Sequence, residues 1–283
     1  MLKLEYTEVM GWEHAIRGMR NPMNSWEKSD SGDICSCEQK LDEGDRHIPY
    51  CLRHFYPRRD EVLIGPNDHA LMMKLRNAGT DHRKFLRMIT VYVDITAPLY
   101  WWKEFDTYKV GTVANSCSTM HKIHEKEFTL DDFSHELLLA DTEEDHMEID
   151  IPLIVDPNDF ESVFGPTEVL NLTINMLNAC RLKYLETWDA RYFHQMIQLL
   201  PSSYNQKRTV MMNYEVLANI WKSRRNHKLG EWRNDICGWI KTLPYSELIT
   251  GEAVNVADAT ERGEIPAFLG KKFNVKKEED NAD

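Results

Sequence analysis

The stretch LLPSSYNQKRTVMMNYEVLANIWKSRR, from Leu199 to Arg225, decides the fold that we expect for this chain. Apolar residues recur at helical spacing in its second half and again in the segment that follows: Val216, Leu217, Ile220 and Trp221, then Trp232, Ile236, Trp239 and Ile240. This spacing predicts two helices, each with one apolar face to bury against a core. Two polar residues, Asn219 and Arg224, lie near the end of the first helix.

Arg224 is the residue of this stretch that has most to offer a ligand. A guanidinium is planar and always charged, and its five donors suit a pyrimidine carbonyl or a phosphate. The alternative is a solvent-exposed side chain that pairs with Glu231 across the turn between the two helices, because charged helix ends usually lie at the surface. Spacing alone leaves both interpretations open.

Length and composition favour a globular protein. With 283 residues, 42% of them hydrophobic and eight of them Trp, the chain can bury a sizeable core in one large domain. Its formal net charge of −12 argues against a surface that binds nucleic acid, because neutralising phosphates needs a basic face. Small anionic ligands remain possible in a local pocket.

The beginning of the chain gives an expectation about location. Residues 1–7 alternate apolar and polar side chains, as a strand does, and lack the apolar core of a signal peptide. No run approaches the roughly 18 apolar residues of a membrane span. We therefore expect a cytoplasmic protein without a membrane partner, whose cysteines are reduced.

Four residues in a polar loop over 30–65 have the types that zinc prefers: Cys35, Cys37, Cys51 and His54. Their C-x-C and C-x-x-H spacing suggests a tetrahedral zinc site, and the alternative is three free thiols with a surface histidine. The other cysteines are interpreted as ordinary buried thiols: Cys117, Cys180 and Cys237.

Periodicity predicts the remaining elements. Strict alternation from Ile89 to Ile95 indicates a half-buried strand that ends at Ala97-Pro98. Helices are expected over 12–19, 67–77, 99–109 and 167–200, and the aromatic stripe of the third is more typical of core than of a cofactor site. We expect one domain over 1–270, with the Cys-bearing loop, an acidic insertion over 125–165 and a disordered tail over 271–283.

The order of Leu200-Pro201, Asn213, Asn219 and Arg224 resembles the flavin-dependent thymidylate synthases, in the form of a divergent, phage-like member. A second block supports this resemblance, because Gly79-Thr-Asp-His82 is followed fifteen residues later by Ala97-Pro98. Together the two blocks, 79–120 and 168–242, cover about two fifths of the chain.

The sequence also departs from the pattern of that family. Where the family has Arg-His-Arg, this chain reads Thr107-Tyr108-Lys109, so one cation of the cluster is kept. Two further arginines of the family are replaced by Ile197 and by Glu215. Nearby cations that could substitute are Lys103, Arg208 and Arg225.

The resemblance implies an α+β fold in which an antiparallel sheet core is flanked by helices. It also implies methylation of dUMP to dTMP with methylenetetrahydrofolate, FAD and hydride from NADPH. Arg224 would then be catalytic and hold the pyrimidine, with Ser118 beside the uracil. The positions implied for cofactor binding are His82, Lys109, Asn115, Asn213 and Asn219.

Members of that family are homotetramers that bind flavin between subunits. The aromatic helices bearing Trp101-Trp102 and Trp232 to Trp239 are therefore expected at such interfaces. An alternative is a repurposed homologue that keeps the fold as a nucleotide-binding or protein-interaction scaffold. A third interpretation keeps flavin and nucleotide but changes the pyrimidine or the one-carbon acceptor.

Overall fold

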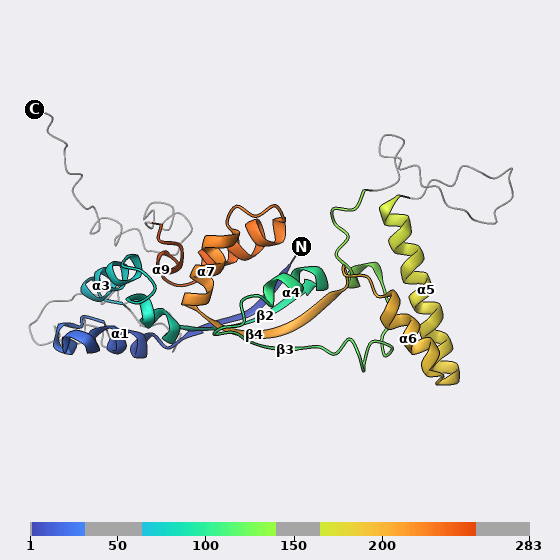
Figure 1. Cartoon of the computed structure of the whole chain (residues 1–283), viewed down its shortest axis with the longest axis horizontal. Helices are drawn as coiled ribbons and strands as arrows, with labels where there is room; N and C mark the ends of the chain where they lie inside the picture. Colours follow the sequence, from blue (N-terminus) through green and yellow to red (C-terminus); the bar gives the residue numbers. More distant parts are fainter. Residues whose placement is uncertain (1, 32–63, 140–164, 253–283) are drawn as a thin grey trace, which may run out of the picture.

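The computed structural model of this chain describes residues 2–31, 64–139 and 165–252. The elements form an elongated molecule with a sheet in its middle (Figure 1). Helices α1 (Trp12–Arg20) and α3 (Pro66–Asn77) lie at one end. The long helix α5 (Pro166–Thr187) and its partner α6 (Ala190–Leu199) lie at the other end.

The described strands form one antiparallel sheet in the order β1-β2-β4-β3. Their bounds are β1 Lys3–Met10, β2 Thr90–Pro98, β3 Val113–Ser116 and β4 Asn205–Asn213. The strands expected at the N-terminus and before Ala97-Pro98 are confirmed. The short β3 and the polar β4 were not predicted, because neither alternates clearly enough to signal a strand.

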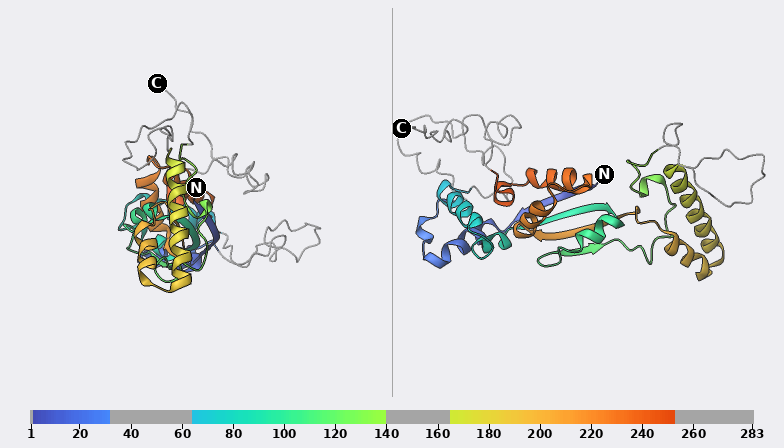
Figure 2. Two further views of the ribbon diagram at one scale, coloured as in Figure 1. Left: turned by 90° about the vertical axis from the view of Figure 1, so that its right-hand side faces the viewer. Right: turned by 45° about the horizontal axis from the view of Figure 1, so that its top comes forward.

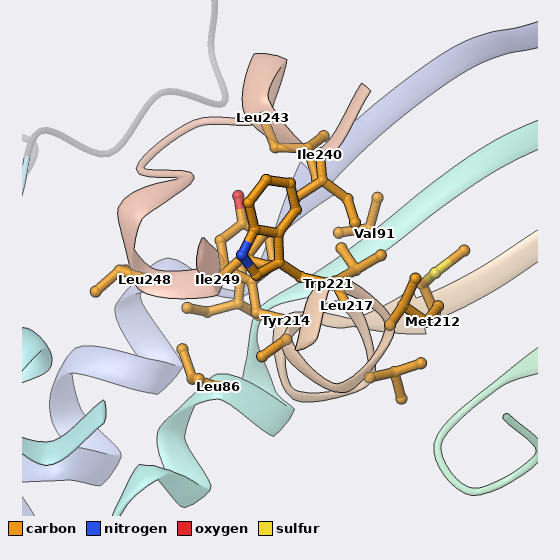
Figure 3. Packing of buried hydrophobic residues seen from close by; sticks show 14 of the residues in the cluster. Leu86, Val91, Met212, Tyr214, Leu217, Trp221, Ile240, Leu243, Leu248 and Ile249 are labelled. Carbon is orange, nitrogen blue, oxygen red and sulfur yellow. The ribbon is translucent and has the colours of Figure 1, made fainter. Parts of the chain in front are cut away.

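Helices cover one face of the sheet, as the alternation along β2 requires. Val91, Val93 and Ile95 are fully buried on this face, and Val91 and Val93 pair with Met212 and Val210 of β4. The covering elements include η4 (Arg83–Met88), α4 (Leu99–Phe105), α7 (Tyr214–Arg224), η6 (Glu231–Ile236), α8 (Cys237–Thr242) and α9 (Glu247–Thr250). Figure 3 shows Trp221 of α7 packed among the apolar side chains of this core.

The aromatic helices belong to the core of a single chain. Trp101, Trp102 and Trp232 are at most 1% exposed, and the rings of Trp101 and Trp232 stack with centroids 4.6 Å apart. The expectation of subunit contacts is therefore wrong for Trp101, Trp102 and Trp232, whose assignment to the core is confirmed. Trp239 is only partly buried, and its place at a subunit interface stays a prediction. Helix α4 also ends at Phe105, earlier than expected, and a turn follows in which the amide and the Oγ1 of Thr107 both donate to the Glu104 carbonyl.

A second, smaller core lies between α5 and α6, which stand crosswise to the strands (Figures 1 and 2). The single helix expected over 167–200 is wrong, because Trp188 adopts a left-handed conformation with φ 56° and Asp189 caps α6 through the backbone amide of Arg191. Phe128 and Phe133, from the first part of the predicted acidic insertion, pack into this core. Residues 140–164 of that insertion lie outside the described residues.

The buried ion pair between Arg20 and Asp68 helps to hold the chain around Ser31 close to the chain around Ile64. Asp68, which is fully buried, accepts hydrogen bonds from Arg20 Nε (2.6 Å), Ser29 Oγ (2.6 Å) and the backbone amide of Ser31 (3.0 Å). The amide of Gly65 then donates to Ser31 Oγ at 2.8 Å. The chain positions on either side of segment 32–63 are thus held together, and the proposed zinc ligands Cys35, Cys37, Cys51 and His54 lie outside the described residues.

The cysteines that the structure describes differ in exposure. Cys180 and Cys237 are buried, as expected, and burial raises the pKa of the Cys237 thiol to about 11. Cys117 is exposed, so its assignment as a buried thiol is wrong. It follows the edge strand β3, whose side chains are all exposed. Within the described ranges, no helix is both long and apolar enough to cross a membrane.

Candidate functional site

Helix α7 carries three of the predicted site residues, and the first of them starts the helix. Asn213 is the N-cap, and its Oδ1 accepts a hydrogen bond of 3.0 Å from the amide of Val216. Gly111 packs against it so closely that a Cβ there would come within 2.9 Å of Asn213 Nδ2. The exposed Lys109 lies in this same turn, whose backbone is closed by a bond from the Thr112 amide to the Lys109 carbonyl.

Arg224, in the last turn of α7, lies against the end of α4. Its Nε donates to Tyr108 Oη at 2.9 Å and its NH1 donates to Glu104 at 2.5 Å. The guanidinium lies over the Trp232 ring at 4.9 Å from the ring centroid, and His227 Nε2 is 3.4 Å from Glu104. The expected alternative partner, Glu231, is instead buried and accepts from Tyr100, so the Arg224–Glu231 pair is wrong.

Asn219 faces the other side of α7 and contacts η4. Its Oδ1 accepts a bond of 3.1 Å from Arg83 NH2, and Arg83 Nε donates to Glu215 at 3.1 Å. His82 is the exposed residue just before Arg83, in the turn that follows Gly79. Glu215, which stands where the family resemblance expects arginine, is therefore paired with a cation of its own chain.

Asn115 and Ser118 lie along the sheet edge, on and just after β3. Asn115 pairs with Thr209 of β4, and Ser118 Oγ accepts a bond of 3.0 Å from the amide of His121. Arg208 is opposite Ser116 in the register and lies over the Trp102 ring at 4.2 Å, where Asp106 binds its NH1 at 2.8 Å. Of the expected substitute cations, Arg208 is thus paired, whereas Lys103 and Arg225 are exposed.

The predicted residues therefore form separate groups within one chain. Asn219 binds Arg83, the residue after His82. Asn213 contacts Gly111, in the turn that contains Lys109, and Arg224 binds the end of α4. Successive residues of a helix turn by about 100°, so Asn219 and Arg224 point about 140° apart around α7. Asn219 is exposed and Arg224 partly exposed, and among the described residues they contact different neighbours and not each other.

Reasoning from the sequence missed three contacts: that of Arg83 with Asn219, and those of Glu104 and Tyr108 with Arg224. Arg83 adjoins the predicted His82, so adjacency was an available signal. Glu104 lies about 120 positions before Arg224 in the chain, and no local pattern links the two. Tyr108 was noted only as a replacement of a family histidine, although its hydroxyl is a donor and acceptor that fits beside a guanidinium.

Two further features describe the electrostatics around this site. Burial, with the hydrogen bond to Glu231, raises the pKa of Tyr100 to about 12. Thr112 Oγ1 is buried and has no hydrogen-bond partner in the part of the chain that the structure describes, so a polar ligand atom could satisfy it. Across the ranges described, no group of three His, Cys, Asp or Glu side chains could hold a metal ion.

Comparison of the structure with solved proteins identifies its architecture. Thymidylate synthase X of Helicobacter pylori, solved with FAD and dUMP, matches with a TM-score of 0.53 and 15% identity, covering 89% of this chain and 98% of that one. The chain shares the fold of the flavin-dependent thymidylate synthases. A second structure of the flavin-dependent thymidylate synthase of Helicobacter pylori, complexed with FAD and dUMP, gives a TM-score of 0.52 at 15% identity, over 89% of this chain and 97% of that one.

A UMP/dUMP methylase of Streptomyces cacaoi, bound with 5-Br dUMP, matches at a TM-score of 0.46 and 13% identity, over 89% and 94% of the two chains. No protein-family model matches the sequence, and no curated protein matches it either. The thymidylate synthase likeness therefore concerns the fold, and it confirms the predicted α+β class with an antiparallel sheet flanked by helices.

Proposed function

We propose that this protein is a flavin-dependent thymidylate synthase-like enzyme that methylates dUMP, with Arg224 holding the pyrimidine nucleotide. The geometry of Arg224 is the observation that carries this proposal. Its guanidinium is oriented by Tyr108 and by the Trp232 ring, and its NH2 group has no hydrogen-bond partner among the described residues. Donors fixed in a plane in this way suit a uracil carbonyl or a phosphate.

The charge around Arg224 supports an anionic ligand. The protein as a whole carries −12, but Lys222, Arg225 and Lys228 are exposed within four residues of Arg224. A local cluster of cations on an acidic protein raises the concentration of small anions at that spot. Ser118, whose Oγ still has a hydrogen to donate, is proposed as a second contact to the nucleotide from the sheet edge.

We propose that the flavin lies beside His82 and Asn219. The donors there fit the polar edge of an isoalloxazine, because Arg83 and the Asn219 amide are held in place by each other and by Glu215. The unpartnered Thr112 Oγ1, near Asn115 in the chain, is a further polar atom that a cofactor could satisfy. Lys109, Asn115 and Asn213 complete the proposed contacts.

The flavin, when bound, would carry the hydride supplied by NADPH, and methylenetetrahydrofolate would supply the carbon. The chain's own part is to bind and orient the reactants. Arg224 would hold the pyrimidine at a fixed angle and stabilise negative charge that develops on its carbonyl oxygen. Trp232 and Trp101, stacked beneath, keep that guanidinium in a weakly hydrated position.

We also propose that the complete site is assembled between copies of the chain, in a homotetramer. The support is that Asn219 and Arg224 point to different neighbours within one chain. Exposed apolar residues on the first half of α5, Val169, Leu172 and Met176, recur on one side of that helix and suit contact with another copy. Light scattering of the purified protein tests this, and a monomeric mass would contradict it.

The main test is the visible spectrum of the purified protein before and after addition of FAD, with dUMP then titrated in. Bound flavin absorbs near about 450 nm, and the proposal expects this band to shift when dUMP binds. The Arg224→Lys variant keeps the charge but loses the planar fork, so it should respond to dUMP at least about tenfold more weakly. Arg191→Lys, at the exposed pair with Asp189, is the matched control.

A second candidate function is a non-catalytic scaffold, and one observation favours it. Three arginines around the site are each paired with a carboxylate of the same chain: Arg224 with Glu104, Arg208 with Asp106, and Arg83 with Glu215. Such pairs neutralise the charge that would otherwise bind phosphate. A protein that stays colourless with FAD and does not respond to dUMP would support the scaffold and end the enzyme proposal.

A further inference from the structure

We infer that Glu104 is an internal competitor for the anion site at Arg224, so that the affinity of the site is set by how readily this carboxylate is displaced. The inference rests on the proposed function, since it concerns the same arginine, and it adds a residue that controls affinity. It starts from the contact itself: Glu104 binds Arg224 NH1, and only 16% of the arginine side chain and 30% of the glutamate side chain are exposed.

The chemistry of the two candidate partners is the same. A guanidinium recognises a carboxylate and a phosphate through the same pattern of charge-assisted N–H to oxygen bonds. Glu104 therefore occupies donors that an anionic ligand needs. The orientation of the guanidinium does not depend on Glu104 alone, because Tyr108 binds Nε and the Trp232 ring supports its face. Displacement of the carboxylate would leave Arg224 in place and ready to bind.

The position of Glu104 in its helix also points to this role. It lies in the last turn of α4, where the carbonyl ends of the helix disfavour a negative charge. The contacts that favour a carboxylate there come from outside α4, from Arg224 and from His227 Nε2 at 3.4 Å. Arg224, in the last turn of α7, is by contrast favoured by its own helix. Glu104 is thus the partner that its own helix holds less firmly.

The test is isothermal titration of the full chain and its Glu104→Gln variant with two probes, inorganic pyrophosphate and dUMP. The variant keeps the shape of the side chain and removes its charge. We expect it to bind both anions about threefold to fivefold more tightly than the unaltered protein, the effect of removing one partly screened ion pair. Glu5→Gln is the control, because it makes the same change in net charge at an exposed residue of β1.

A second variant keeps the test specific. In the Arg224→Lys background, Glu104→Gln should give less than a twofold change, because the fork for which Glu104 competes is gone. Thermal unfolding of each protein, followed by tryptophan fluorescence, checks that the variants are folded. A gain of equal size in Glu5→Gln would overturn the inference, since it would then be an effect of total charge.

The two probes separate this inference from the proposed function. A gain in pyrophosphate affinity without any binding of dUMP supports the role of Glu104 and counts against thymidylate synthesis. Binding of dUMP that Glu104→Gln leaves unchanged or weakens overturns the role of Glu104 and leaves the proposed function standing. If neither anion binds either protein, both proposals fail.

Discussion

The Nε atom of Arg83 lies 3.1 Å and 3.0 Å from the two carboxylate oxygens of Glu215, and both side chains are largely buried. Glu215 stands where the family resemblance expects arginine. The inverted charge is therefore matched by a cation on η4, and the same cation binds Asn219 through NH2. From the sequence alone, glutamate at position 215 indicates the loss of a ligand contact. In the structure, Glu215 instead belongs to a polar cluster with Arg83 and Asn219 that joins η4 to α7.

We predict that Glu215→Ala destabilises the protein by about 3 kcal/mol, because Arg83 then stays largely buried without its partner. Urea unfolding at neutral pH measures this. Glu186→Ala is the control, because Glu186 forms an exposed ion pair with Lys183. Loss of that pair should cause no measurable change in the free energy of unfolding. A loss in Glu215→Ala no larger than in the control would contradict the assigned ion pair.

A pH dependence is predicted for Asp68. Burial raises the pKa of this carboxyl, but hydrogen bonds from Ser29, Ser31 and Arg20 outweigh that effect and hold the pKa below its ordinary value of 3.8. A lowered pKa in the folded state adds stability that is present above pH 3.8 and is lost as the pH falls through the folded pKa.

Asp68→Asn should therefore cost about 3 kcal/mol at pH 7, because Arg20 stays buried without a charged partner. The difference between the variant and the unaltered protein should shrink below pH 3.8. Urea unfolding between pH 7 and low pH measures both effects. A gap that stays constant over that range would show that Asp68 is not ionised with a lowered pKa in the folded protein.

Tyr100 should show the opposite dependence on pH. Its pKa is raised to about 12, mainly by burial and also by Glu231, so its contribution to stability is present below pH 10 and lost as the pH rises toward 12. Tyr100→Phe removes the donor to the buried Glu231 and should cost about 2 kcal/mol at neutral pH. Tyr92→Phe, at an exposed site on β2, should be neutral in the same unfolding measurement.

The zinc site proposed for Cys35, Cys37, Cys51 and His54 gives a prediction that needs only elemental analysis. Purified protein should contain about one zinc per chain, and Cys51→Ser with His54→Ala should remove it. Cys237→Ser is the control, because this thiol is buried and its pKa is raised to about 11. Metal content that is unchanged by the double substitution would rule out these ligands.

Periodic patterns predicted the parts of the fold that depend on a single element. The alternation from Ile89 to Ile95 predicted strand β2. Helix α7 was predicted by the helical spacing of Val216, Leu217, Ile220 and Trp221. Both predictions succeeded because each pattern reflects the burial of one face of the element. Strand β4 was not predicted, because Lys207, Arg208 and Thr209 interrupt the alternation of its apolar residues. Its partners come from β2 and β3, more than 90 positions earlier in the chain.

The candidate site was predicted less completely, for a related physical reason. The resemblance indicated Asn213, Asn219 and Arg224, and the structure places all three on α7 or at its start. What each of them binds depends on Gly111, Arg83 and Glu104, which reach α7 only through tertiary packing. The break between α5 and α6 was missed because a single left-handed residue, Trp188, has no signature in apolar spacing.

The hydrogen bond from the Gly65 amide to Ser31 Oγ holds the two ends of the segment between these residues next to each other. The entropy of closing a loop grows only slowly with its length, so the sheet and its helices are nearly indifferent to how many residues lie between these two points. Related proteins could therefore gain, lose or exchange the segment at this position without redesigning the core. The fold thus has an insertion site between Ser31 and Gly65, and in this chain the C-x-C and C-x-x-H residues belong to the inserted segment.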